Sequence, residues 1–215
     1  MTRSHGVHPL RHWRRLPWLA RYEVGERVAS RLRRGAIWAT HQHCTVEFRG
    51  RARLGPGFSL MIPGPGTLIV GDHVDFRRGF VCEISGNGRV VIGDRAIFTS
   101  HALIQCSTSI EIGDEAMLGQ DLFIADGNHR FRDWRRNLLE QGYDFRPIRI
   151  GARAAINTKS TILNSVGDGA IVGANSVVTK PIPPYCVAVG APARVIDYFG
   201  PPELRPPELE ERVTT

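Results

Sequence analysis

Apolar residues recur at every sixth position through most of the chain. Six sets of three follow this spacing, and all of their positions are apolar: Phe48/Leu54/Leu60, Val70/Phe76/Cys82, Ile92/Phe98/Ile104, Ile112/Leu118/Ile124, Ile150/Ile156/Ile162 and Val166/Val172/Val178. A period of six matches neither the turn of an α-helix, about 3.6 residues, nor the simple alternation of a strand. It matches a coil of three short strands that points one large side chain per strand into a triangular core. The pattern therefore predicts an all-β solenoid.

Small residues and glycines support this interpretation. Alanines such as Ala96, Ala102 and Ala116 stand four places after the large residues. Glycine follows the inward aliphatic residue, as in Val70-Gly71-Asp72 and Ile92-Gly93-Asp94, which suits a cramped corner. Because paired backbones lie about 4.8 Å apart, six stacked coils predict a prism on the order of 30 Å tall.

One interval departs strongly from the period. The first residues of neighbouring sets lie 16 to 22 residues apart, except for Ile112 and Ile150, which are 38 residues apart. The excess predicts an inserted loop that runs from roughly residue 125 to residue 149. Long excursions from a rigid scaffold are usually functional, so a site is expected on this loop.

These repeats resemble those of the hexapeptide-repeat family, whose members fold as left-handed parallel β-helices. The resemblance covers about residues 48–198 and is most specific over 150–196, IGARAAINTKSTILNSVGDGAIVGANSVVTKPIPPYCVAVGAPARVI. This segment is similar to the terminal coils of the galactoside/maltose/xenobiotic O-acetyltransferase branch. The resemblance implies a left-handed parallel β-helix of about six coils with one long loop. It also implies a homotrimer with a binding groove between neighbouring subunits.

A histidine on the inserted loop is the candidate catalytic residue. In the resembled acetyltransferases a histidine on this loop is the general base, and the spacing from Ile112 to His129 matches. A hydroxyl is a weak nucleophile toward a thioester, and a base that removes its proton accelerates the attack by roughly 10² to 10⁴. Asp126 or a backbone carbonyl is expected to fix the tautomer of His129. The loop sequence alone also fits a solvated histidine beside Asn128.

Acceptor contacts are expected from Thr99 and His101, one coil earlier than the coil that carries the loop, and from Asp126 and Asn128 on the loop. The chain departs here from the galactoside-acetylating members, which carry asparagine in the segment of Thr99 and His101 and an acidic residue at the position of Ser107. These departures leave the acceptor open. A backbone N–H or a polar side chain is expected to stabilise the oxyanion of the tetrahedral intermediate.

Acyl-coenzyme A is the co-substrate that the resemblance implies, with no metal required. The pantetheine amides need backbone polar groups, and the phosphates need cations. Five residues occupy positions that contact the coenzyme in the family: Thr158, Ala174, Thr179, Lys180 and Arg194. From composition alone, Lys180 and Arg194 fit solvated surface cations just as well.

The two ends of the chain differ from the repeats. Residues 1–45 hold nine arginines and two glutamates, and this excess equals the net charge of +7 of the whole chain. The remainder is neutral, so nucleic acid is not expected as a partner. Residues 17–34 predict a basic amphipathic helix that Gly35 ends. We expect it to pack over the first coil, with association with a membrane surface as the open alternative.

The predicted organisation has three parts: a basic segment with a helix (1–45), a β-helix (46–198), and a tail rich in proline and glutamate (199–215). Four scattered cysteines without a CxxC pair favour reduced thiols. The chain shows no apolar run long enough to span a bilayer and no apolar core of a signal peptide. A cytoplasmic location is therefore expected.

The leading hypothesis is an acyl-CoA-dependent O-acyltransferase, most simply an O-acetyltransferase, that acts on a hydroxyl of a sugar or a glycosylated metabolite. A γ-type carbonic anhydrase shares the scaffold and needs three converging imidazoles. Only His73, His101 and His129 are available in the repeats, and their spacing does not match. A non-catalytic scaffold that assembles through its basic N-terminal segment is the third alternative.

Overall fold

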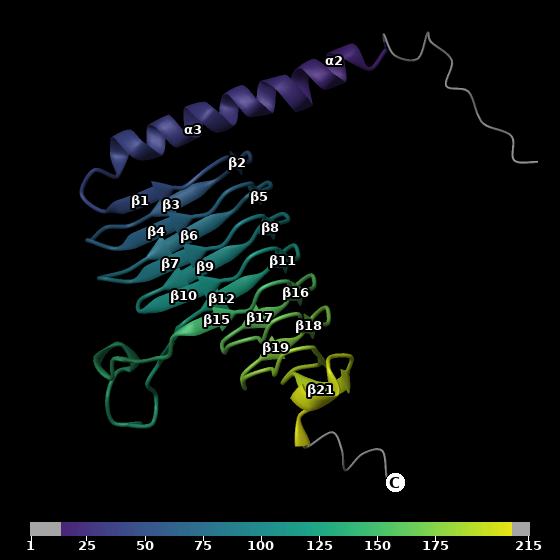
Figure 1. The fold of residues 1–215 in the computed structure, drawn as a ribbon. Helices are drawn as coiled ribbons and strands as arrows, with labels where there is room; N and C mark the ends of the chain where they lie inside the picture. The colour runs from purple at the N-terminus through teal and green to yellow at the C-terminus, as the bar shows by residue number, and fades with distance from the viewer. Residues whose placement is uncertain (1–13, 208–215) are drawn as a thin grey trace, which may run out of the picture.

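The computed structural model describes residues 14–207, in which parallel strands wind into a three-sided prism (Figure 1). The predicted all-β solenoid is confirmed, and its fold is the left-handed parallel β-helix. The first sheet contains β1 (Thr45–Phe48), β4 (Thr67–Val70), β7 (Arg89–Ile92), β10 (Ser109–Ile112) and β15 (Ile148–Ile150). The second contains β2 (Ala52–Leu54), β5 (Val74–Phe76), β8 (Ile97–Phe98), β11 (Met117–Leu118), β16 (Ala155–Ile156), β18 (Ile171–Val172), β20 (Cys186–Val189) and β21 (Arg194–Tyr198). The third contains β3 (Ser59–Met61), β6 (Val81–Ile84), β9 (Leu103–Cys106), β12 (Phe123–Ala125), β17 (Thr161–Ile162) and β19 (Val177–Val178).

The strand register confirms the predicted period of six. The first members of the six sets pair from coil to coil along the first sheet, and the second and third members pair along the other two sheets. All of these side chains are buried except Phe48 and Leu60, which lie in the first coil and are half-buried. The rings of Phe76 and Phe98 stack in the core of the early coils, and the ring of Phe80 packs against both at an angle.

The corners are fixed by hydrogen bonds between successive coils. The first corner joins the first sheet to the second, and the second corner joins the second sheet to the third. The third corner joins the third sheet to the first sheet of the next coil. At the first corner, the Asp94 carboxylate accepts from the backbone N–H of Asp72 at 2.8 Å, and Asp114 accepts from that of Asp94 at 2.8 Å. A Cβ on Gly93 would lie 2.7 Å from the backbone nitrogen of Asp114. The aliphatic-Gly-Asp repeat thus reflects close contact between coils.

The N-terminal helix is longer than the sequence predicts. It runs through α2 (Leu16–Leu19), a π-helical turn η1 (Ala20–Gly25) and α3 (Glu26–Thr40), and crosses the end of the prism (Figure 1). The prediction that Gly35 ends the helix was wrong. A Cβ at Gly35 would face open space, and the helix continues because Ile37, one half-turn on, is buried against the first coil. This contact outweighs the cost of glycine in a helix, about 1 kcal/mol.

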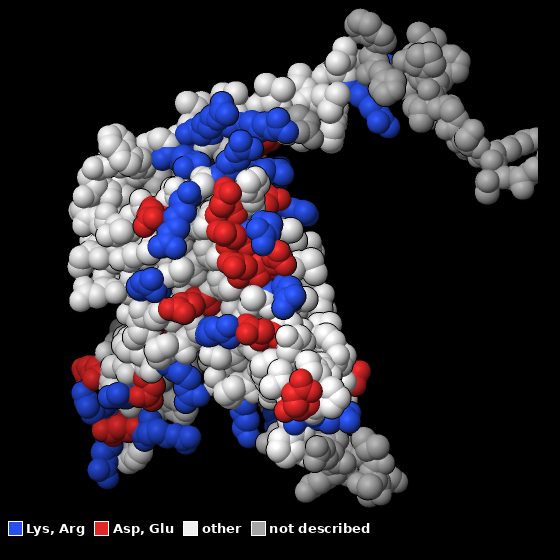
Figure 2. Space-filling view, in the orientation of Figure 1, with Lys and Arg blue, Asp and Glu red and all other residues white. Residues whose placement is uncertain are grey.

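At the other end, β21 folds back antiparallel to β20 and closes the prism. A 3₁₀ turn, η3 (Pro202–Leu204), follows, and the last part of the predicted tail, 208–215, lies outside the described residues. None of the helices within 14–207 has the length and apolar character needed to cross a membrane. Figure 2 shows basic residues gathered where the N-terminal helix meets the first coils, whereas acidic and basic residues alternate on the coils below.

Candidate active site

The inserted loop leaves the third corner after β12 and returns at β15, so it spans 126–147, whereas the sequence predicts roughly 125–149. Its two ends form an antiparallel hairpin of β13 (Gly127–His129) and β14 (Tyr143–Phe145), with His129 opposite Tyr143. A 3₁₀ turn, η2 (Leu138–Glu140), lies farther out. The loop is therefore an ordered arm whose base carries His129.

Strand alternation gives the hairpin two different faces. His129, Tyr143 and Phe145 line a pocket of about 420 Å³ between the hairpin and the outward side of the third sheet. Asn128 and Asp144 line a second pocket of about 220 Å³ on the opposite face. The hairpin thus separates two pockets along the third corner, and each extends toward different coils.

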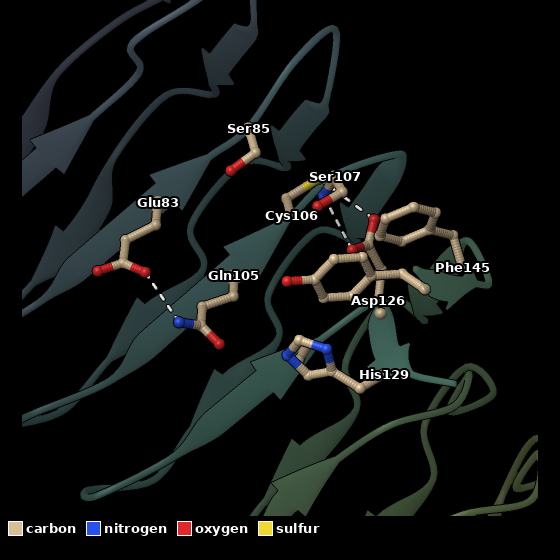
Figure 3. Close-up of a pocket in the computed structure, with 11 residues that line it drawn as sticks. Glu83, Ser85, Gln105, Cys106, Ser107, Asp126, His129 and Phe145 are labelled. Atoms are coloured by element: carbon tan, nitrogen blue, oxygen red, sulfur yellow. Dashed lines mark hydrogen bonds between the residues drawn. The ribbon is translucent and has the colours of Figure 1, made fainter. Parts of the chain in front are cut away.

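His129 lies in the larger pocket, and its imidazole points toward the outward face of the third sheet (Figure 3). Its ring centroid is 4.2 Å from that of Tyr143, and the ring of Tyr143 stacks on Phe145 at 5.5 Å. The Nδ1 atom is buried and has no hydrogen-bond partner among residues 14–207. A buried polar atom without a partner is costly, so packing alone does not account for this histidine at the base of the hairpin.

Asp126 anchors the base of the hairpin to the preceding coil. Its carboxylate accepts from the backbone N–H of Ser107 at 2.8 Å, the backbone N–H of Thr108 at 2.6 Å and the Thr108 hydroxyl at 2.8 Å. The expectation that Asp126 or a backbone carbonyl fixes the tautomer of His129 is not met, because the Nδ1 atom of His129 has no hydrogen-bond partner among residues 14–207. Burial, together with the charge of Asp126, raises the pKa of the nearby Cys106 thiol to about 12.

Two features of the pocket were missed in the sequence. The amide of Gln105 donates to the Glu83 carboxylate at 2.8 Å on the outward face of the third sheet (Figure 3). Glu83 and Gln105 occupy paired positions in adjacent coils, so polar residues in register were the available signal. The aromatic wall of Tyr143 and Phe145 shows only as a short alternation, Tyr143-Asp144-Phe145, inside a segment that the sequence predicts as a loop.

The predicted acceptor residues fall into two separate groups. Asp126 lines both pockets and Asn128 lines the smaller one, beside the hairpin. Thr99 and His101 lie instead at the second corner, between β8 and β9. His101 is exposed, has a φ of 59° and lies 3.3 Å from the Asp121 carboxylate. The single chain therefore does not bring Thr99 and His101 together with His129.

The predicted coenzyme positions follow the last coils. Thr158 and Ala174 lie at the second corner in neighbouring coils, and Thr179 and Lys180 follow β19 at the third corner. Thr179 lines the smaller pocket, next to the hairpin. Arg194 begins β21 and is exposed, as is Lys180. Neither cation forms an ion pair with any residue in the described part of the chain.

The three histidines of the metal hypothesis lie apart in the single chain. His73 is at the first corner, His101 at the second corner, and His129 on the hairpin. Within 14–207, no group of three or more His, Cys, Asp or Glu side chains is placed to hold a metal ion.

The curated relatives are acetyltransferases. A probable acetyltransferase of Mycobacterium tuberculosis is 36% identical over 96 residues, which are 44% of this chain and 32% of the relative. The galactoside O-acetyltransferase of Escherichia coli is 35% identical over 91 residues, 41% of this chain and 43% of the relative. The serine acetyltransferase of M. tuberculosis is 34% identical over 123 residues, 53% and 50% of the two chains. The chain thus spans about a third to a half of the length of these relatives. No protein-family model matches the chain.

Solved structures share the fold over most of the chain. A variant of AntD, an N-acyltransferase from Bacillus cereus in complex with dTDP and coenzyme A, aligns with a TM-score of 0.64 at 17% identity and covers 84% of this chain and 95% of AntD. A variant of the GDP-perosamine N-acetyl transferase of Caulobacter crescentus, in complex with CoA and GDP-perosamine, has a TM-score of 0.50 at 19% identity and covers 85% and 74%. At these identities the likeness concerns the fold. Relatives and structural neighbours are hexapeptide-repeat acyltransferases, which confirms the resemblance.

Proposed function

We propose that the chain is an acyl-CoA-dependent acyltransferase, and that it transfers the acyl group, most simply acetyl, to a hydroxyl of a sugar or a glycosylated metabolite. The acetyltransferase names of its sequence relatives support the reaction class. The observation that carries the proposal is the placement of His129. It lies in a pocket at the base of the inserted hairpin, with a buried Nδ1 atom that no described residue satisfies.

His129 acts as the general base in this proposal. Its imidazole removes the proton of the acceptor hydroxyl while the oxygen attacks the thioester carbonyl. A backbone N–H of the cleft donates to the oxyanion of the tetrahedral intermediate. The carbon–sulfur bond then breaks, and the imidazolium returns the proton to the departing thiolate of coenzyme A. The ring of Tyr143, 4.2 Å from that of His129, holds the imidazole in place.

Acyl-CoA is placed along the last coils, below the hairpin. Thr179, which lines the smaller pocket, is the predicted coenzyme position nearest the hairpin. The exposed cations Lys180 and Arg194 are assigned to the phosphates, because neither is committed to an acidic partner among the described residues. Because the hairpin separates this pocket from that of His129, the thioester end has to pass the edge of the hairpin to reach the imidazole.

A homotrimer is part of the proposal. Thr99 and His101 lie at the second corner, and His129 is at the third corner of the same chain. A neighbouring subunit that presents its second corner to this hairpin would bring the two groups into one cleft. Sedimentation velocity of the purified chain tests the trimer directly, and a monomer at the concentrations used for assay would contradict it.

The central test is His129→Ala, with acetyl-CoA and a panel of sugar and glycoside acceptors, read by release of the coenzyme thiol. Loss of a general base lowers the rate by roughly 10² to 10⁴. The matched control is His73→Asn, which changes an exposed histidine of the first corner, with a φ of 57°, to a residue that tolerates this backbone.

The melting temperatures of both variants are expected to stay close to that of the parent chain, because His129 belongs to the hairpin and the side chain of His73 pairs with the exposed Asp72 carboxylate at its corner. A His129→Ala variant that retains full turnover would contradict the assignment of the base. Isothermal titration with coenzyme A adds an independent readout, since both variants are expected to bind it as the parent does.

A further inference from the structure

The N-terminal helix contacts the solenoid with one face only. Ser30, Arg33, Arg34 and Ile37 lie on this face, which follows the three- and four-residue spacing of a helix. The Ser30 hydroxyl accepts from the backbone N–H of Leu54 at 2.8 Å, and the Arg33 guanidinium donates to the carbonyl of Leu54 at 2.6 Å. Ile37 is buried against the core. The helix is therefore fixed in orientation on the first coil.

The opposite face is apolar, and no residue within 14–207 covers it. Val24, Val28 and Leu32 follow one another at four-residue spacing and are 60%, 50% and 69% exposed. Val28 and Leu32 each lie two positions from Ser30, which places them about half a helical turn away from the contact face. The solenoid holds this row of side chains outward, away from its own core.

The apolar surface continues beyond the solenoid. Figure 1 shows α2 and the following π-helical turn extending past the edge of the first coils. Trp18 and Tyr22 in this part are 55% and 51% exposed, and their ring centroids lie 5.3 Å apart. Because the helix crosses the end of the prism (Figure 1), a flat surface can reach its whole outer side without meeting the coils.

The charge of this segment indicates what kind of partner binds the apolar row. Residues 1–45 carry nine arginines and two glutamates, whereas the rest of the chain is neutral. Arg21 and Arg31 are exposed beside the apolar row. A second copy of the chain would bring two strongly cationic helices together, which is unfavourable. An anionic lipid surface satisfies both features, because it takes up apolar and aromatic side chains and attracts arginines.

We propose that the outer face of helix 16–40 docks this protein on the surface of an anionic phospholipid bilayer, with Val24, Val28 and Leu32 inserted at the level of the headgroups. This interaction is independent of the acyl-transfer reaction. The sequence-based expectation that the helix packs over the first coil is confirmed by the contacts of Ser30, Arg33 and Ile37. The proposal adds a membrane-binding face on the other side of the helix.

The test is co-sedimentation of the full chain with vesicles of phosphatidylcholine alone and of phosphatidylcholine mixed with phosphatidylglycerol. Binding is expected only to the anionic vesicles and is expected to weaken at high salt. Val28→Glu/Leu32→Glu removes two inserted side chains and should lower the partition coefficient by about 100-fold. Arg21→Ser/Arg31→Ser should lower it by about 30-fold, because one basic residue near such a surface contributes about five-fold.

The matched control is Ile196→Glu, which changes a 55% exposed apolar residue of β21 at the opposite end of the solenoid. It should bind vesicles as the parent chain does, and all variants should melt at the parent temperature. Equal binding to neutral and anionic vesicles, or undiminished binding of Val28→Glu/Leu32→Glu, would overturn the proposal. An oligomer that the parent chain forms without lipid and that Val28→Glu/Leu32→Glu does not form would also overturn it. The apolar face would then bind a second copy of the chain.

Discussion

The solenoid and the inserted hairpin are stabilised in different ways. Each coil is held by the coils above and below it, through backbone pairing and through carboxylates such as Asp94 that reach the next coil. The hairpin is held by its own pairing and, at its base, by the buried carboxylate of Asp126. Farther out, Phe131 and Trp134 are 64% and 84% exposed. One region therefore has mutually supporting contacts, and the other has few.

This difference explains where the candidate chemistry lies. Within the coils, inward side chains are committed to packing, and most corner groups are committed to the next coil. His129 is placed where these constraints end, one strand beyond the third sheet. A rigid frame thus fixes the base of the hairpin, while the side chains on the hairpin stay available to a substrate.

The largest expected effect tests the packing of the coils. Phe98 is fully buried against Phe76 and Phe80, with ring centroids 5.0 and 4.9 Å away. Phe98→Ala should lower the free energy of unfolding by about 3–5 kcal/mol. That loss corresponds to a fall in melting temperature on the order of 10 °C for a domain of this size.

The matched change in the loop is Phe131→Ala, where the exposed ring contacts the guanidinium of Arg132 at 5.0 Å. It should change the free energy of unfolding by less than about 0.5 kcal/mol. Thermal melting followed by circular dichroism measures both variants. If Phe98→Ala and Phe131→Ala lowered the free energy of unfolding by similar amounts, the hairpin would contribute to the stability of the fold as much as the core does.

The same contrast decides what the sequence could predict. All six apolar sets were found in the correct register, because each coil repeats the same requirement: one large inward residue per side and a tight corner. Repetition made each weak signal stronger. The length of the helix was missed because it depends on a tertiary contact of Ile37 rather than on the local preference of Gly35.

The site was predictable only in part. The sequence located the loop and His129, because an interruption of a period is as visible as the period. It did not predict the pairing of 127–129 with 143–145, since a single short hairpin has no repeat to reveal it. The role of Asp126 was also missed, because its donors are backbone groups of the preceding coil, at Ser107 and Thr108.

A smaller effect is expected from adding one methyl group in each region. In the solenoid, Gly93→Ala would place its Cβ 2.7 Å from the backbone nitrogen of Asp114 and 2.9 Å from the backbone carbon of Gly113. Backbone cannot move aside without separating two coils. We expect a loss of about 1–3 kcal/mol in the free energy of unfolding, measured by urea denaturation.

In the hairpin, Gly127→Ala would place its Cβ 2.8 Å from the ring of Phe145. That ring is 48% exposed and can turn away. Stability should therefore hardly change, whereas release of the coenzyme thiol should fall several-fold, because Phe145 supports Tyr143 against His129. A Gly127→Ala variant that is as destabilised as Gly93→Ala would show that the hairpin is as tightly packed as the coils.

The smallest effect concerns the pH dependence of the first corner. The backbone N–H of Arg51, which donates to the Asp72 carboxylate at 2.6 Å, holds the pKa of Asp72 below its ordinary value, and the neighbouring His73 acts in the same direction. The folded state therefore favours the deprotonated carboxylate. This contribution to stability is present above the ordinary pKa of an aspartate, about 4, and is lost as the pH falls through the lowered value.

Asp72→Asn should accordingly lower the melting temperature at neutral pH by less than Gly93→Ala does, and its difference from the parent should vanish in acid. Asp133→Asn is the matched change in the loop, where the carboxylate accepts from the backbone N–H of Arg135, two residues away. Because that hydrogen bond does not join two coils, the melting temperature of Asp133→Asn should equal that of the parent chain at every pH. A difference for Asp72→Asn that persists in acid would mean that the side chain acts through packing, and that the coils are not joined through its charge.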